Sequence, residues 1–280
     1  MKCSLCPRRC NAERTENENL NGFCKMPLLP VAARAALHFW EEPCISGKNG
    51  SGTVFFTGCN LDCAFCQNYE VSHLKKGKPI TYKRLADIFK ELEEAGAHNI
   101  NLVSPSHYVG AIIRALDIYK PKIPVVYNSG GYDTPENIRA LKDYADIFLM
   151  DLKYLSPDRA KKYSGAENYP EYAVSAVKQA YLQQPECVFK NGIMQKGVIV
   201  RHLLLPLGTR EAIAVFDWVR ENTPGAYFSI MSQYTPCGRA EQYPEINRRV
   251  TKREYEKVLT YICNTDFRNV YIQERNSSDE

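Results

Sequence analysis

Residues 57–68 read TGCNLDCAFCQN and place Cys59, Cys63 and Cys66 in a CxxxCxxC motif. The motif directly follows the β-rich run Thr53–Thr57, so we expect the three thiols just beyond the carboxyl end of a strand. Three thiolates at this spacing can ligate three irons of a [4Fe–4S] cluster and leave the fourth iron without a protein ligand. The alternative is a closed zinc site that a distant fourth cysteine completes.

The composition around this motif is that of an ordinary globular protein. The chain has 280 residues, of which 44% are hydrophobic and 24% charged, which suits one large α/β domain and excludes collagen and coiled coil. A formal net charge of only +4 predicts no large basic surface for nucleic acid. No apolar run approaches the about 18 residues of a membrane span, and no signal peptide is evident, so we expect a cytoplasmic protein without a membrane partner.

A second group of cysteines lies at the start of the chain. The 11 cysteines are unusual in a protein too large to need disulfides. Four of them precede the CxxxCxxC motif as Cys3, Cys6, Cys10 and Cys24. Four thiolates complete a tetrahedral site, so this head is expected to hold a zinc ion or a second iron–sulfur cluster. Zinc is favoured, because it would stabilise a short segment that has little core of its own.

Beyond this head, short β-rich runs alternate with amphipathic helical patterns, as in a parallel α/β sheet or barrel. The expected strands are Thr53–Thr57, Asn99–Val103, Pro124–Asn128, Ile147–Asp151, Gly197–Leu205, Tyr227–Met231 and Val270–Gln273. Helix signals between them are the apolar face of Leu85, Phe89 and Leu92, the cap Thr134-Pro135, and the capping box of Thr251 and Glu254.

Five or six β–α units exceed an open nucleotide-binding half and fall short of the eight of a full barrel. We therefore predict a partial TIM barrel of the (β/α)6 type in an α/β protein. Its expected organisation is a cysteine-rich head over residues 1–45, the barrel over 46–275 and a disordered tail over 276–280.

The CxxxCxxC motif, with Phe65 just before its last cysteine and a strand before it, resembles the signature of the radical S-adenosylmethionine (SAM) superfamily. Residues 3–10 (CSLCPRRC), 38–43 (HFWEEP) and 50–53 (GSGT) extend the resemblance to the branch of the pyruvate formate-lyase-activating enzyme and its uncharacterised relatives. The resemblance implies a [4Fe–4S] cluster whose open iron binds SAM and cleaves it to a 5′-deoxyadenosyl radical. Phe65 would then pack near the adenine.

The resemblance also implies an oxidoreductase with particular partners. Its substrate would be a protein or peptide, of which a glycyl-radical enzyme is one candidate, and its reductant a protein such as flavodoxin or ferredoxin. The barrel residues leave a small metabolite open as substrate, because specificity is carried by substrate loops. A non-catalytic iron–sulfur or zinc module for electron transfer is the alternative from another class.

Three charged residues at strand ends are the catalytic candidates, because chemistry in such barrels occurs at the carboxyl ends of the strands. Asp151 and Lys153 close the fourth strand, where burying an Asp-x-Lys pair is costly without a purpose. The pair resembles the Asp-Leu-Lys that the activating enzymes carry around SAM. Arg201 resembles their inward arginine, and the period-two alternation of the fifth strand places it on the face opposite His202.

Polar residues after the other strands are candidates for binding SAM. Ser104 and Ser106 stand where the activating enzymes carry a glycine-rich turn that holds the SAM amino group, and their hydroxyls can accept hydrogen bonds from an ammonium. Asn128 precedes two glycines that permit close approach of the backbone to a ligand. Tyr127 replaces the Asp of the family's monovalent-cation motif, so no cation site is expected there. Gln233 follows the sixth strand, about where the family contacts the ribose or adenine.

Overall fold

The structure is a computed structural model that describes residues 2–273, apart from the side chains of residues 19 and 20. Its strands are β1 (Glu13–Arg14), β2 (Asn19–Leu20), β3 (Val31–His38), β4 (Ser51–Phe56), β5 (Lys78–Pro79), β6 (Ile100–Val103), β7 (Val125–Ser129), β8 (Ile147–Asp151), β9 (Val188–Lys190), β10 (Ile193–Leu203), β11 (Tyr227–Met231) and β12 (Val270–Ile272). Its helices are α1 (Pro43–Ser46), α2 (Tyr69–Ser72), α3 (Tyr82–Glu94), α4 (Val109–Ile118), α5 (Pro135–Ala140), α6 (Pro157–Ser164), α7 (Tyr169–Gln183), α8 (Thr209–Asn222) and α9 (Lys252–Cys263), with the 3-10 turns Ser106–Tyr108 and Ala240–Gln242.

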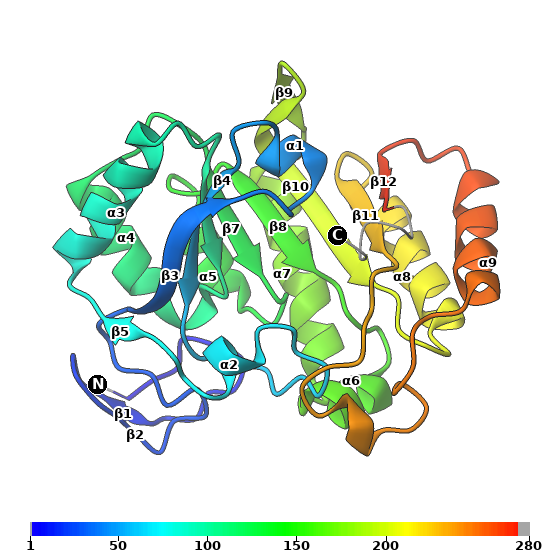
Figure 1. Cartoon of the computed structure of the whole chain (residues 1–280), viewed down its shortest axis with the longest axis horizontal. Coiled ribbons are helices and arrows are strands. Elements are labelled where there is room, and N and C mark those ends of the chain that lie inside the picture. Colours follow the sequence, from blue (N-terminus) through cyan, green and yellow to red (C-terminus); the bar gives the residue numbers. More distant parts are fainter. Residues whose placement is uncertain (1, 274–280) are drawn as a thin grey trace.

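One large sheet runs through the molecule in the order β12-β11-β10-β8-β7-β6-β4-β3-β5, and β9 pairs with β10 off this path (Figure 1). Pairing is parallel from β4 to β12, whereas β3 is antiparallel to both β4 and β5. Within residues 2–273 the two ends of this order do not pair, so the sheet is open. The predicted α/β fold with a partial barrel is confirmed.

Every expected strand coincides with a parallel strand of this sheet. β8 and β11 match their predicted bounds residue for residue. The largest difference is at β10, which begins at Ile193 because its first residues form an antiparallel hairpin with β9. The predicted helix signals are also confirmed: Leu85, Phe89 and Leu92 are buried in α3, Thr134 caps α5, and Thr251 and Glu254 form the capping box of α9.

Side-chain alternation divides the interior of the sheet from its helix-covered face. In β8, Phe148 and Met150 belong to the core under the helices, whereas Ile147 and Leu149 face the other way. There they pack against Ile45 of α1, which lies across the sheet interior (Figure 1). Helix α1 therefore fills the partial barrel with apolar side chains near the amino ends of the strands. Space remains only toward their carboxyl ends.

The N-terminal segment contributes to the sheet as well as forming a separate head. Strand β3 lies within the expected head of residues 1–45, yet it pairs with β4 in the main sheet. The preceding hairpin β1–β2 lies outside that sheet. The domain boundaries stay a prediction, and the expected tail of residues 276–280 lies outside the described residues. No helix among the described residues is both long and apolar enough to cross a membrane.

Two buried histidines fasten the loops that follow strand ends. His107 Nε2 donates to the carbonyl of Thr57 at 2.8 Å, and His202 Nδ1 donates to the carbonyl of Leu152 at 2.8 Å. Burial lowers the pKa of each imidazole from its ordinary 6.5 to about 4, although the carbonyl contacts favour the charged form. Both rings are therefore neutral in the folded protein at neutral pH.

These histidines predict an acid-sensitive fold. Because the unfolded chain binds their protons first, the stability they contribute is complete above pH 6.5 and is lost as the pH falls toward 4. Each histidine should cost about 2 kcal/mol of unfolding free energy between pH 7 and pH 5. In the variant His107→Gln/His202→Asn, amides donate in place of Nε2 and Nδ1 without titrating. Urea unfolding should show a shallower pH dependence for it; equal slopes would refute this account.

Gly131 makes the tight turn after β7 that the neighbouring strand end requires. Its φ is +81°, and a Cβ at this position would lie 2.0 Å from the carbonyl oxygen of Asp151. Gly131→Ala should therefore lower the free energy of unfolding by about 2–5 kcal/mol, from backbone strain and the clash together. The matched variant is Gly110→Ala in α4, where a Cβ meets nothing within 4 Å, and we expect it to be neutral or stabilising. Similar losses in both variants would contradict the turn argument.

Candidate active site

A cavity of about 430 Å³ lies at the carboxyl ends of the parallel strands, a size typical of small-molecule sites. All of the residues that the sequence analysis proposed for the cluster, SAM and catalysis line it. They are Cys59, Cys63, Phe65, Cys66, Ser104, Ser106, Asn128, Asp151, Lys153, Arg201 and Gln233. The structure thus brings together side chains from six strand ends, although their individual roles stay predictions.

The cysteine-bearing loop takes its shape from two other segments. The backbone amides of Asp62 and Ala64 donate to the carbonyls of Ser164 and Tyr163, at 3.1 and 2.8 Å. From the other side, Arg239 donates to the carboxylate of Asp62 at 2.5 Å and, through its own backbone amide, to Ala64. Helix α6 and the segment after β11 therefore fix the loop between them.

Each of the three thiols has a hydrogen-bonding partner of its own. The amide of Leu61 donates to Cys59 Sγ at 3.4 Å, and the hydroxyls of Ser164 and Ser72 lie 3.1 and 3.2 Å from Cys63 Sγ and Cys66 Sγ. Donors of this kind stabilise thiolate ligands and tune the potential of a cluster.

Burial raises the pKa of the Cys59 thiol to about 12 and that of the Cys63 thiol to about 11, so these sulfurs ionise only beside positive charge. Lys153 acts in that direction on both. Iron would supply the remaining positive charge. Three grouped sulfurs, each with a donor, at the wall of a cavity fit a [4Fe–4S] cluster with one open iron.

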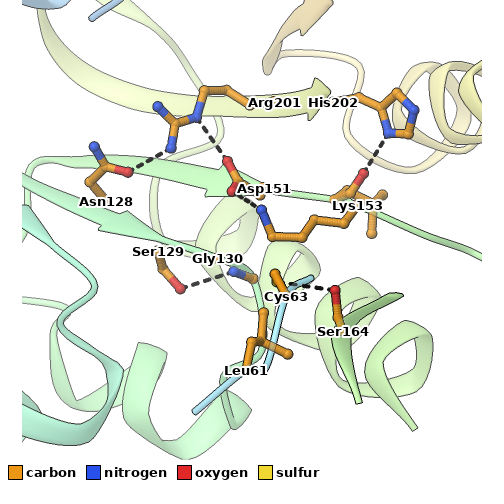
Figure 2. Close-up of polar contacts among 12 residues, drawn as sticks. Leu61, Cys63, Asn128, Ser129, Gly130, Asp151, Lys153, Ser164, Arg201 and His202 are labelled. Carbon is orange, nitrogen blue, oxygen red and sulfur yellow. Dashed lines mark hydrogen bonds and ion pairs between the residues drawn. The ribbon is translucent and has the colours of Figure 1, made fainter. Parts of the chain in front are cut away.

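The charged candidates are joined by hydrogen bonds and ion pairs into one network at the carboxyl ends of the strands (Figure 2). Asp151 accepts from Lys153 Nζ at 2.5 Å and from Arg201 Nε at 2.9 Å, and Arg201 also donates to the amide oxygen of Asn128 at 2.6 Å. Burial alone would raise the pKa of Asp151, but the two cations hold it below its ordinary value. Arg201 points into the cavity and His202 away from it, as the strand alternation predicted.

Two glutamates of this network were missed by the sequence analysis. Glu41 accepts from the side-chain amides of Asn101 and Asn128 and from Arg201, each at 3.1 Å. Glu42 is 2% exposed, and its carboxylate lies 3.9 Å from Arg201. Both belong to the segment HFWEEP, which was quoted only for its resemblance. Two adjacent carboxylates between an aromatic pair and a proline were the available signal.

The SAM candidates differ in how firmly they are held. Ser106 Oγ lies 3.5 Å from Ser129 Oγ, and the amide of Ser104 donates to the carbonyl of Asn128 at 3.0 Å. The ring of Phe65 packs edge-on against Tyr234, with centroids 5.8 Å apart. Gln233 lines the cavity beside these groups.

The four cysteines of the head are not part of this cavity. Burial, together with smaller contributions from the thiols of Cys24, Cys3 and Cys10, raises the pKa of Cys6 to about 12, so the four cysteines lie near one another. Arg14 donates to Cys3 Sγ at 3.6 Å. Among the described residues, no group of three or more His, Cys, Asp or Glu side chains has the geometry of a site for a single metal ion.

The chain is similar in sequence to a known protein family and to one further protein. The family model of the radical SAM superfamily matches residues 53–197, just over half of the chain. An uncharacterised protein of Methanocaldococcus jannaschii is 32% identical over 267 residues, which cover 92% of this chain and 73% of that protein.

Two solved structures share the fold. SuiB of Streptococcus suis is 14% identical with a TM-score of 0.55, over 81% of this chain and 49% of SuiB, so the chain spans about half of SuiB's length. Methylornithine synthase is 16% identical with a TM-score of 0.50, over 74% of this chain and 59% of that enzyme. The match of the family model to just over half of the chain shows that this chain belongs to the radical SAM superfamily.

Proposed function

We propose that the protein cleaves SAM reductively at a [4Fe–4S] cluster held by Cys59, Cys63 and Cys66 and then abstracts hydrogen from a protein or peptide. Superfamily membership implies the cluster, SAM and a radical enzyme. The observation that carries the residue assignment is the single cavity in which the three cysteines meet the charged network of Asp151 and Arg201.

Once bound, the cluster and SAM supply a 5′-deoxyadenosyl radical, and the chain's own residues position it and protect it. Lys153 is the cation that favours ionisation of Cys63. We assign Asp151, Lys153 and Arg201 to positioning SAM and the substrate backbone, because their mutual contacts hold them rigid inside the cavity. Phe65 would pack on the adenine.

The polar groups of SAM then fall to four residues of the cavity wall: Ser104, Ser106, Asn128 and Gln233. Their hydroxyl and amide groups can exchange hydrogen bonds with an ammonium, a carboxylate or a ribose. They belong to three strand ends, because Ser104 and Ser106 both follow β6, Asn128 lies near the end of β7 and Gln233 follows β11, and all four line the same cavity.

A polypeptide substrate is supported by the rim of the cavity. Trp40, which lines the cavity, is 67% exposed, and the adjacent Phe39 is 51% exposed. Neighbouring exposed aromatics next to an open site are typical of surfaces that bind another chain. We therefore take a glycyl-radical enzyme as the leading substrate and a flavodoxin or ferredoxin as the reductant, in the cytoplasm.

Alanine at Cys59, Cys63 and Cys66 together should abolish cluster assembly and SAM cleavage, because the cavity then offers no thiolate to iron. The protein is reconstituted anaerobically with iron and sulfide, reduced with dithionite and given SAM, and 5′-deoxyadenosine is quantified. Cys263→Ala, which removes an exposed cysteine of α9, should behave as the wild type. If the triple variant still forms 5′-deoxyadenosine, the ligand assignment is wrong.

We further propose that Cys3, Cys6, Cys10 and Cys24 bind a structural zinc ion, with a second iron–sulfur cluster as the alternative. Protein purified aerobically should then contain about one zinc per chain. The variant Cys3→Ala/Cys6→Ala should lose that zinc while the cluster in the barrel still assembles. About eight irons per chain after reconstitution, against about four for one cluster, would show a second cluster and overturn the zinc assignment.

A further inference from the structure

The floor of the cavity holds a buried carboxylate without a hydrogen-bonding partner. Glu42 lines the cavity and is 2% exposed, and among the described residues neither of its carboxylate oxygens accepts a hydrogen bond. The buried hydroxyl of Ser229 faces Glu42 closely enough to lower its pKa, but the two groups do not form a hydrogen bond of ordinary geometry. The side-chain oxygen of Asn101, whose amide nitrogen donates to the carboxylate of Glu41, also accepts no hydrogen bond among the described residues. Native proteins rarely bury such groups unless something binds them.

The charges of the cavity compensate Glu42 only in part, because the cation that faces it, Arg201 at 3.9 Å, also pairs with Asp151 and Glu41. From the cysteines inward, Lys153 pairs with Asp151, Asp151 with Arg201, and Arg201 with Glu41. Two cations thus face three carboxylates once Glu42 is included, and Arg201 is already shared by Asp151 and Glu41. Burial raises the pKa of Glu42, because the attraction of Arg201 offsets the lost hydration only in part and the neighbouring Glu41 adds to the rise.

The position of Glu42 argues against a role in holding α1 in place. Cys44 and Ile45 of α1 belong to a buried apolar cluster with strand residues such as Leu149 and Ile199, so apolar contacts hold α1 against the sheet. A carboxylate next to this apolar contact destabilises the packing of α1, since burying a charge without a full counter-charge costs free energy. Glu42 also lies at the end of the ion-pair series that begins with Lys153, the cation acting on Cys63, so it is removed from the cysteines.

We propose that Glu42, with Glu41 and the hydroxyl of Ser229, forms a subsite for a cationic nitrogen of the substrate, an ammonium or a guanidinium. This subsite rests on the proposed function, whose substrate class it specifies. A cation there supplies the missing counter-charge, donates to the two free oxygens of Glu42 and to Ser229, and balances the three carboxylates of the cavity. The side chain of a lysine or arginine in a polypeptide has this chemistry, as does a small amine.

The test measures binding to the reconstituted protein loaded with SAM, by calorimetry under anaerobic conditions. The probes are arginine and lysine as free amino acids and as the central residue of acetyl-Gly-X-Gly-amide, with citrulline and norleucine as neutral counterparts. We expect at least one cationic probe to bind about tenfold or more tightly than its neutral counterpart. A preference for the peptides would favour a polypeptide substrate, and a preference for the free amino acids a small one. No preference for charge in either series overturns the proposal.

Glu42→Gln keeps the shape of the side chain and removes its charge. It should weaken binding of the cationic probe about tenfold or more and leave the melting temperature unchanged or higher, because an unpaired buried charge is lost. A purely structural glutamate would instead lower the melting temperature and leave the charge preference intact, and that outcome refutes the subsite. Glu70→Gln, which removes an exposed carboxylate paired with Lys76, controls for net charge.

The cation subsite and the proposed reaction can be disproved independently of each other. Charge-selective binding in a protein that forms no 5′-deoxyadenosine with dithionite would leave the subsite standing and remove the proposed reaction. Formation of 5′-deoxyadenosine without charge-selective binding would do the reverse.

Discussion

The ion pairs of Asp151 with Lys153 and Arg201 join the cysteine-bearing loop to the interior of the sheet. Asp151 ends β8, and its register partner in the parallel β10 is Arg201, so the backbone pairing itself brings the two charges together. Removing one partner from such a buried pair costs about 3–5 kcal/mol, because the other charge is left without compensation. The carbonyl of Asp151 is fixed as well, since it accepts from the hydroxyl of Tyr169 at 2.8 Å.

The interior of the partial barrel is apolar toward the amino ends of the strands and charged toward their carboxyl ends. Helix α1 lies at the boundary between the two parts. Ile45 of α1 is fully buried among strand side chains, and this packing stabilises the apolar part of the interior. The two glutamates just before α1 are carried into the barrel by that same packing. Burial of an apolar helix thus offsets the cost of placing Glu42 where its charge has no dedicated partner, as functional sites commonly require.

Most of this architecture could be predicted from the sequence, because parallel strands and capped helices leave local signals. The period of two along β10 placed Arg201 and His202 on opposite faces, and the resemblance to the activating enzymes indicated which of the two points inward. Glu41 and Glu42 could not be assigned in this way. They precede the first parallel strand and reach the cavity only because β3 folds back antiparallel to β4 and α1 enters the barrel. That placement depends on contacts between distant segments, such as Asn99 donating to the carbonyl of Ile45 at 2.7 Å.

The contacts of the N-terminal head could not be predicted from the sequence either. They connect the four cysteines of the head to the loop that carries Cys59, Cys63 and Cys66. Spacing alone indicated that its four thiols belong together, but not that Arg8 and Arg14 fasten it to the barrel. Arg8 donates to the carbonyl of Asn60, next to Cys59, at 2.8 Å. Buried Arg14 donates to the carbonyl of His107, whose ring donates to Thr57 just before the cysteine-bearing loop. A head that loses its order would withdraw these donors, so the geometry at Cys59 depends on whatever holds the head's thiols together.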